Sequence, residues 1–271
     1  MSKTIKFLLM VTCLVVIYIA FLMYSDRKVE MGHVPQLQVP ESVLKLSVED
    51  GEKELLKGVK ATDEEDGNIT SKIFIENISV FDENQQRTVT YAVFDSDDNI
   101  VRATRQIKYT DYEEPEFTIK KALFIYYLDS TEQLKDYVSA SSVVDGDLSP
   151  QISIESSAYN QDDEFYVVYS VTDSCGTTTT FKTKATWLNY EPNIDIQLTD
   201  YLIRVEKGET IYPREYIDTI EDMGVENDSL ESLIDINDDY DSSKEGTYEF
   251  IYRINRSNGD YGITKLVVIV E

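Results

Sequence analysis

The sequence has little histidine, cysteine or positive charge. Its 271 residues include one histidine, two cysteines, and 25 lysines and arginines against 51 aspartates and glutamates. A single histidine, His33, excludes a Ser-His-Asp triad and a metal site built from several histidines. Two distant cysteines, Cys13 and Cys175, exclude a disulfide framework and a zinc–thiolate site. The net charge of −26 argues against nucleic acid as a partner, because phosphate binding needs a basic face.

Long apolar runs are also scarce, and the one present lies near the N-terminus. Residues 7–24 read FLLMVTCLVVIYIAFLMY and carry no charge. A helix of this length rises about 27 Å, which is about one hydrocarbon core. The run ends with bulky residues at 21–24, where a signal peptidase needs small ones. We therefore expect an uncleaved signal-anchor, with a cleaved signal peptide as the alternative.

The chain is acidic but has enough apolar residues to fold, since 42% of the sequence is hydrophobic. We expect a single-pass cell-membrane protein with residues 30–271 extracellular. The basic residues flanking the apolar run are nearly balanced, so charge fixes the orientation only weakly. Acidic residues do not hinder translocation of such a domain.

Two motifs recur along this acidic region. Asp66-Gly67 and Asp145-Gly146 are 79 residues apart, and the strings that begin at Tyr91 and Tyr169, both Tyr-x-Val-x-Asp-Ser, are 78 apart. Prolines open three segments at similar intervals, at positions 35, 115 and 192. A shared period predicts three repeats of one structural unit. The third is divergent, with Asp222-Met223-Gly224 where the Asp-Gly loop is expected.

Each repeat has the pattern of a small β-sandwich. Apolar residues alternate with polar ones, which predicts strands with one core-facing side, and Asp-Gly and Ser-Asn-Gly clusters mark turns between them. The expected core-facing residues are Val89, Tyr91 and Val93 in repeat 1, Phe165, Val167, Tyr169 and Val171 in repeat 2, and Tyr248, Phe250, Tyr252 and Ile254 in repeat 3. Tyr248 also has the spacing of an Ig-type tyrosine corner. A short helical turn is expected at 134–138.

These patterns predict an all-β fold: tandem Ig-like β-sandwiches after one transmembrane helix. The predicted segments are 1–34 for the cytoplasmic tip, anchor and linker, 35–112 for repeat 1, 113–190 for repeat 2, and 191–271 for repeat 3.

The first repeat carries a family resemblance. Residues 62–73, TDEEDGNITSKI, followed by Tyr91, Asp95 and Arg105, resemble the bacterial Ig-like repeat of Gram-positive surface proteins. The same module ends one class of pesticidal crystal proteins and is distantly similar to hyalin-type repeats. Repeat 2 departs from it at 175–177, and repeat 3 matches mainly at 205–212 and in its last two strands. The resemblance covers 35–271 and implies an extracellular spacer, adhesion or ligand-presenting module, with no catalytic residues.

Acidic loops are the sharpest local feature, and their oxygens are the ligands that calcium prefers. Calcium would also relieve the self-repulsion of the acidic chain. The alternative is that these residues only form turns. The calcium candidates are Asp63, Asp66, Asp95, Asp97 and Asn99 in repeat 1, and Asp145, Asp147 and Asp173 in repeat 2. No other cofactor is expected.

Two other side chains have a functional and a structural interpretation. Trp187 is a possible sugar-stacking platform, but its alternation with Phe181, Thr183 and Ala185 favours packing. Cys175 is an odd thiol in an exported domain, suited to an intermolecular disulfide or to an ordinary turn. The structural interpretation is preferred for both.

The expected function is non-catalytic: a structural or protein-interaction module whose partner is an unknown protein. The alternative is a module that binds carbohydrate or a cell-wall polymer. Carboxylate pairs suited to glycoside hydrolysis arise by chance among so many acidic residues, so enzyme activity is the least favoured hypothesis.

Overall fold

A computed structural model describes residues 12, 14–22, 34–127, 130–161 and 164–271. Residues 14–22 are helical. Most of the flanks of this helix, and so much of the predicted membrane segment 7–24, lie outside the described residues. Among the residues that are described, no helix is both long enough and apolar enough to cross a membrane. Membrane anchoring therefore stays a prediction.

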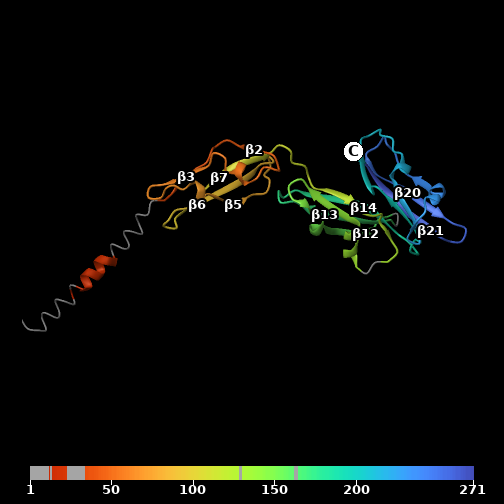
Figure 1. Ribbon diagram of the computed structural model, residues 1–271, viewed down its shortest axis with the longest axis horizontal. Coiled ribbons are helices and arrows are strands. Elements are labelled where there is room, and N and C mark those ends of the chain that lie inside the picture. The colour runs from red at the N-terminus through yellow and green to blue at the C-terminus, as the bar shows by residue number, and fades with distance from the viewer. Residues whose placement is uncertain (1–11, 13, 23–33, 128–129, 162–163) are drawn as a thin grey trace, which may run out of the picture. The chain divides into compact units, whose positions relative to one another are not determined.

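The predicted all-β architecture is confirmed for the described part of the chain after residue 33, which consists mainly of strands joined by turns (Figure 1). The chain divides into two compact units, Met1–Asp111 and Tyr112–Glu271. The first unit contains repeat 1, and the second contains repeats 2 and 3.

Repeat 1 is a sandwich of a three-stranded sheet, in the order β1-β3-β4, and a four-stranded sheet, in the order β2-β7-β6-β5. All pairs are antiparallel except β2 with β7. A short helix that was not predicted, α2, contributes Leu55 to the core of this repeat. The elements are β1 (Gln36–Gln38), β2 (Leu44–Leu46), α2 (Glu52–Leu55), β3 (Lys60–Asp63), β4 (Gly67–Asn68), η1 (Thr70–Lys72), β5 (Phe74–Ile78), β6 (Arg87–Phe94) and β7 (Ile100–Tyr109).

Repeat 2 has the same two layers in the same order, β8-β10-β11 against β9-β14-β13-β12. Here too the only parallel pair among the described strands is the edge pair, β9 with β14. The predicted helical turn is the 3-10 helix η2. The elements are β8 (Glu116–Ile119), β9 (Phe124–Ile125), η2 (Thr131–Tyr137), β10 (Val138–Ser142), β11 (Gly146–Asp147), η3 (Ser149–Gln151), β12 (Ser153–Tyr159), β13 (Phe165–Thr172) and β14 (Thr178–Trp187).

Repeat 3 keeps this plan, but its two layers join. Ile194 of β15 pairs with Gly262 of β21, which links β18-β17-β15 to β16-β21-β20-β19. A Cβ on Gly262 would lie 2.7 Å from the Ile194 carbonyl oxygen, so the approach requires glycine. Val101 and Thr179 hold the equivalent positions in the other repeats. The elements are β15 (Ile194–Leu198), β16 (Leu202–Val205), η4 (Pro213–Tyr216), β17 (Ile217–Asp222), β18 (Val225–Glu226), η5 (Asp228–Leu233), β19 (Asp235–Asp238), β20 (Gly246–Asn255) and β21 (Tyr261–Val270).

The predicted core faces are confirmed. Every predicted residue of the central strands is buried, except Phe165 and Tyr248, which are half-buried. Each repeat builds one core from both of its layers. Burial of apolar surface is the main driving force for such a fold.

Repeats 2 and 3 share part of their cores. Leu202 and Val267, from adjacent strands of repeat 3, are buried in the core cluster of repeat 2. Beside them, Lys265 is 1% exposed, and its Nζ donates to Glu249 Oε1 at 2.6 Å and to the Lys184 carbonyl at 2.7 Å. A buried cation this well paired fixes a specific packing geometry at the junction.

Two outer strands contain a β-bulge at equivalent positions. The β5–β6 register shifts between Ile75 and Asn77, and the β12–β13 register shifts between Ile154 and Ser156. A bulge of this kind bends its strand and disrupts regular pairing.

Candidate functional site

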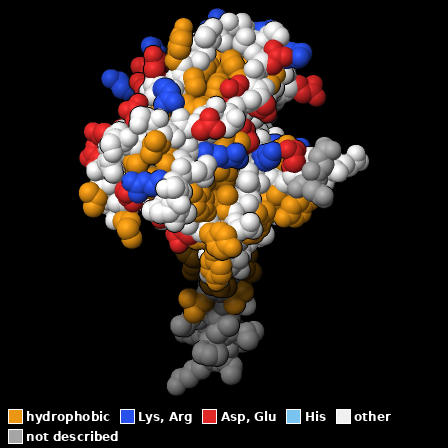
Figure 2. All heavy atoms as spheres, turned by 90° about the vertical axis from the view of Figure 1, so that its right-hand side faces the viewer, with side chains coloured by type: hydrophobic (Ala, Val, Ile, Leu, Met, Phe, Trp, Pro, Cys, Tyr) orange, Lys and Arg blue, Asp and Glu red, His pale blue; other side chains and the backbone are white. Residues whose placement is uncertain are grey.

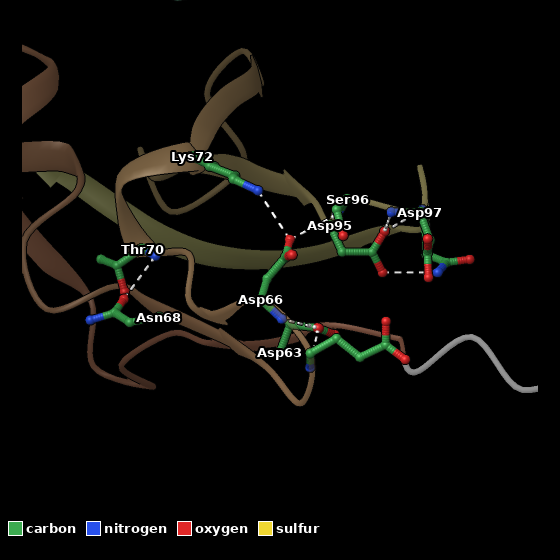
Figure 3. A network of polar contacts seen from close by, with 10 residues as sticks. Asp63, Asp66, Asn68, Thr70, Lys72, Asp95, Ser96 and Asp97 are labelled. Atoms are coloured by element: carbon green, nitrogen blue, oxygen red, sulfur yellow. Dashed lines mark hydrogen bonds and ion pairs between the residues drawn. The ribbon is translucent and has the colours of Figure 1, made fainter.

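The acidic loops of repeat 1 come together at one end of its sandwich (Figure 3). Asp66 Oδ2 accepts a hydrogen bond from the Ser96 amide at 2.8 Å and from Lys72 Nζ at 3.0 Å. The first of these bonds joins the Asp-Gly loop to the turn between β6 and β7. Hydrogen bonds from Ser96 and Lys72 hold the pKa of the Asp66 carboxyl below its usual range.

Of the remaining repeat 1 candidates, Asp63 and Asp95 accept the hydrogen bonds that close turns, and Asp97 and Asn99 are donors to Asp95. Asp63 Oδ1 accepts from the Glu65 and Asp66 amides at 2.8 and 2.9 Å. Asp95 Oδ1 accepts from the amides of Asp97 and Asn99 at 2.9 and 2.8 Å, and the Asn99 side-chain amide donates to its other oxygen. Such bonds are the usual role of aspartate in a turn.

Repeat 2 reproduces these bonds almost residue for residue. Asp145 Oδ2 accepts from the Ser174 amide at 2.8 Å. Asp173 Oδ1 accepts from the amides of Cys175 and Thr177, both at 2.9 Å, and its Oδ2 accepts from the Tyr112 hydroxyl at 2.7 Å. Asp147 caps the following 3-10 helix by accepting from the Ser149 amide. Cys175 is fully buried in this turn, which leaves its thiol inaccessible to another chain.

Repeat 3 replaces the carboxylate with a cation. Arg256 stands four residues after Tyr252, as Asp95 and Asp173 stand after their tyrosines. Its guanidinium pairs with Asp222 at 2.7 Å and with Asp260 at 3.5 Å. The equivalent end of each repeat is thus closed by carboxylate-to-backbone hydrogen bonds in repeats 1 and 2, and by an arginine–aspartate ion pair in repeat 3.

Among the described residues, no group of three or more His, Cys, Asp or Glu side chains is arranged to hold a metal ion. The Oδ1 atoms of Asp63, Asp95, Asp147 and Asp173 and the Oδ2 atoms of Asp66 and Asp145 accept backbone amide protons, whereas Asp63 Oδ2 is buried and has no hydrogen-bond partner among the described residues. Calcium binding nevertheless stays a prediction. A melting temperature that rises in millimolar calcium relative to EDTA would confirm it, and an unchanged one would refute it.

Carboxylates also line a cleft of about 370 Å³ where repeats 2 and 3 meet. Glu164 pairs with Lys184 at 2.5 Å, and Glu249 pairs with Lys265 at 2.6 Å. The hydrogen bond from Lys184, followed by those from Tyr166 and Asn160, holds the pKa of Glu164 below its usual range. A general acid needs a raised pKa, so Glu164 is poorly suited to be the general acid of a glycoside hydrolase.

An aromatic surface at one end of repeat 2 is the site that the sequence analysis undervalued. We define it as Tyr159, Phe165 and Trp187, which come from the ends of β12, β13 and β14. Their rings lie in consecutive contact, with centroids 5.2 Å apart for Tyr159–Phe165 and 6.0 Å apart for Phe165–Trp187. Tyr159 is 59% exposed and Trp187 is 43% exposed. Packing therefore explains only the covered part of the Trp187 side chain, and the exposed part remains accessible to solvent.

The signal for this site was present in the sequence as three aromatic residues at strand ends. The alternation with Phe181, Thr183 and Ala185 favoured packing for Trp187, but its 43% exposure shows that the ring is only partly covered. Alternation does not indicate how far a residue at the end of a strand is covered. Figure 2 shows, on the face that it presents, that other hydrophobic side chains reach the surface among charged ones.

Comparison with known proteins identifies no family. No family model matches the chain, and no curated protein matches it. Among solved structures, the M60 catalytic domain with the CBM51-1 and CBM51-2 domains of Clostridium perfringens ZmpB is 11% identical, with a TM-score of 0.24 over 88% of this chain and 31% of that one. The CBM51-2 (in complex with GlcNAc) and INT domains of the same protein are 18% identical, with a TM-score of 0.24 over 56% of this chain and 41% of that one.

Human CDH23 EC21-23 is 10% identical, with a TM-score of 0.22 over 87% of this chain and all of that one. The chain thus spans less than half of the two Clostridium structures. TM-scores of this size do not define a shared fold, and the assignment of β-sandwiches depends on the strand order and cores described above.

Proposed function

We propose that this protein is a non-catalytic binding module held at the outer surface of a cell membrane. Residues 7–24 would form the anchor, and residues 30–271 would lie outside. The uncharged length of that segment and the bulky residues at its exit support this placement. The bacterial Ig-like repeats of Gram-positive surface proteins are the family that we propose for it.

The proposal rests on the contrast between the carboxylates and the exposed aromatic rings. The carboxylates that suggested calcium binding or hydrolysis accept hydrogen bonds in turns or pair with lysines. Exposed aromatic rings, in contrast, remain available at the surface. Rings exposed in this way are typical of binding sites.

Cross-linking mass spectrometry of the full-length protein in its native membrane tests the proposal. We expect one membrane or wall component to be recovered repeatedly through lysines of repeat 2 or 3. Recovery of neither protein nor glycan, with the same result in cells grown under several conditions, would contradict it.

Carbohydrate binding is the second candidate, and the aromatic surface favours it. Rings with polar edges can stack on the apolar face of a sugar while hydrogen bonding to its hydroxyls. This candidate and the first share the non-catalytic role and differ in the class of partner.

A further inference from the structure

The rings of Tyr159, Phe165 and Trp187 form a continuous aromatic platform at one end of repeat 2, in which the adjacent rings are inclined by 57° and 61° and are not coplanar. Phe165 is half-buried and lies between the other two, so it holds both of them in place. Because the three residues lie at the ends of neighbouring paired strands, the backbone fixes their spacing. The platform is therefore preorganised, and little side-chain entropy would be lost on binding.

The polar edges of the platform are unused. Among the described residues, none accepts a hydrogen bond from the indole N–H of Trp187 or exchanges one with the hydroxyl of Tyr159. The buried tyrosines behave differently: the hydroxyls of Tyr91, Tyr169 and Tyr252 each donate to a backbone carbonyl. The hydroxyls of these three buried tyrosines are paired, whereas the exposed polar edges of the platform are left for a ligand or for water.

The wider surface has the same chemical character. In the described part of 112–190, the exposed large hydrophobic residues are aromatics with a polar edge, apart from Val143. Tyr126 follows Ile125, which pairs with Trp187, and the Tyr126 hydroxyl donates to Glu191. The exposed apolar surface of this repeat is therefore almost entirely aromatic, and each of these rings has a polar edge.

Nucleobases and sugars both present flat faces to such rings. The net charge of −26 opposes nucleic acid, and it also opposes acidic polysaccharides. We propose that the platform of Tyr159, Phe165 and Trp187 binds a neutral oligosaccharide, whose sugar rings stack on the aromatic rings while its hydroxyls bond to the free polar edges. This inference depends on the proposed binding function and names its ligand class.

The site contains its own reporter, because Trp187 is the only tryptophan in the chain. Full-length protein in detergent is titrated with chitotetraose and cellotetraose as neutral probes and with tetragalacturonate as an acidic one, while tryptophan emission is recorded. We expect a saturable change with at least one neutral probe and an affinity at least tenfold lower for tetragalacturonate. A lack of saturable change with both neutral probes would overturn the proposal.

Variants test whether the oligosaccharide binds at the platform, and isothermal titration calorimetry measures their affinity for it. Trp187→Ala and Tyr159→Ala are each expected to lower the affinity at least tenfold, while Trp187→Phe retains most of it. Tyr212→Ala is the matched control, because Tyr212 is an equally exposed tyrosine in repeat 3. Since Tyr159 is mostly exposed, its variant remains informative if Trp187→Ala does not fold. An equal loss in Tyr212→Ala would overturn the proposal.

The cross-linking experiment separates this inference from the proposed function. Recovery of a protein through repeat 2, without neutral glycan binding, would overturn the glycan platform and leave the binding function standing. Failure of both experiments would overturn both.

Discussion

Three equivalent tyrosines, Tyr91, Tyr169 and Tyr252, perform the same structural role in the three repeats. Each is fully buried in the central strand, and each hydroxyl donates to a carbonyl 35 to 39 residues earlier in the chain. The period-two pattern predicted that the rings are buried. It could not predict the acceptors, because these lie in short helical turns without a clear period. The corner predicted for Tyr248 is present, with its hydroxyl 3.0 Å from the Lys244 carbonyl.

Replacing Tyr169 with phenylalanine tests the value of this bond. The variant leaves the buried Leu134 carbonyl without its donor, so we expect a loss of about 1 to 3 kcal/mol in the free energy of unfolding. Urea denaturation followed by circular dichroism measures it. Tyr159→Phe is the control, since its hydroxyl is exposed, and a loss of equal size there would contradict the explanation.

Asp241 predicts a pH dependence. Hydrogen bonds from Lys244 and then Ser243 lower the pKa of its carboxyl to about 2. Because the pKa is lower in the folded state, the carboxylate stabilises the fold above the unfolded value of about 4, and this contribution is lost as the pH falls towards 2. The melting temperature of Asp241→Asn should therefore fall less than that of the unchanged protein between pH 4 and pH 2. Parallel curves would refute this.

Among the structural elements, the β17–β18 hairpin has an unusual turn. Met223 and Gly224 both have positive φ, +52° and +79°, the signature of a type I′ turn. Asparagine adopts this conformation far more readily than methionine, and Met223 is 85% exposed, so little burial is lost on replacement. Met223→Asn should raise the free energy of unfolding by about 0.5 to 1 kcal/mol in urea denaturation. Met223→Val should lower it, and a gain with valine would argue against the turn assignment.

Gly262 governs the joined sheets of repeat 3. In Gly262→Ala, the new methyl group would press on the Ile194 carbonyl, so we expect a destabilisation of about 1 to 3 kcal/mol, measured by thermal unfolding. Gly51→Ala is the control, because Gly51 has open space and an ordinary φ of −83°. Equal melting temperatures for Gly262→Ala and the unchanged protein would show that the strands separate easily.

Element type was predictable wherever the period was clear. The long strands β6, β13 and β20 follow strict alternation, and the sequence located all three. Short elements such as α2 and η5 have no complete period and depend on tertiary contacts, so local patterns missed them. The glycine at 262 gave no signal either, because its purpose is a close approach to a strand almost 70 residues away.

For the whole molecule, the main finding is that repeats 2 and 3 share buried residues. We expect residues 112–271 to unfold in one cooperative transition, because Leu202 and Val267 complete the core of repeat 2. Calorimetry of the full chain should therefore resolve at most two transitions for the three repeats. Three separate transitions would contradict a shared core.

The Lys265–Glu249 pair gives a sharper test of the junction. Lys265→Met removes the cation and leaves the mostly buried carboxylate of Glu249 without a partner. We therefore expect the free energy of unfolding of the second unit to fall by about 3 to 5 kcal/mol. The double variant Lys265→Met, Glu249→Gln should recover much of this loss in urea denaturation, because no unpaired charge remains. Similar stabilities for the single and double variants would rule out a stabilising ion pair.

The sequence indicated the repeats and their acidic loops, but not the hydrogen bonds that these loops make. Aspartates in turns and aspartates around calcium have the same local sequence pattern, so the pattern alone could not place the backbone amides that bond to these carboxylates. Shared burial at the junction was also hidden, because Lys265 sits where alternation predicts a solvent-facing residue.

The bulges in β5 and β12 have a consequence for synthesis. Neighbouring repeats that share strand order and motifs risk pairing with each other's edges before each one has closed. A bulged outer strand is a poor template for such an exchange, since its hydrogen-bonding groups are out of register. In repeat 3 the outer strand β19 is regular but begins and ends with aspartates, Asp235 and Asp238, whose charges oppose the approach of another strand in so acidic a chain. Bulges in repeats 1 and 2 and terminal aspartates in repeat 3 are thus two different obstacles to pairing between outer strands.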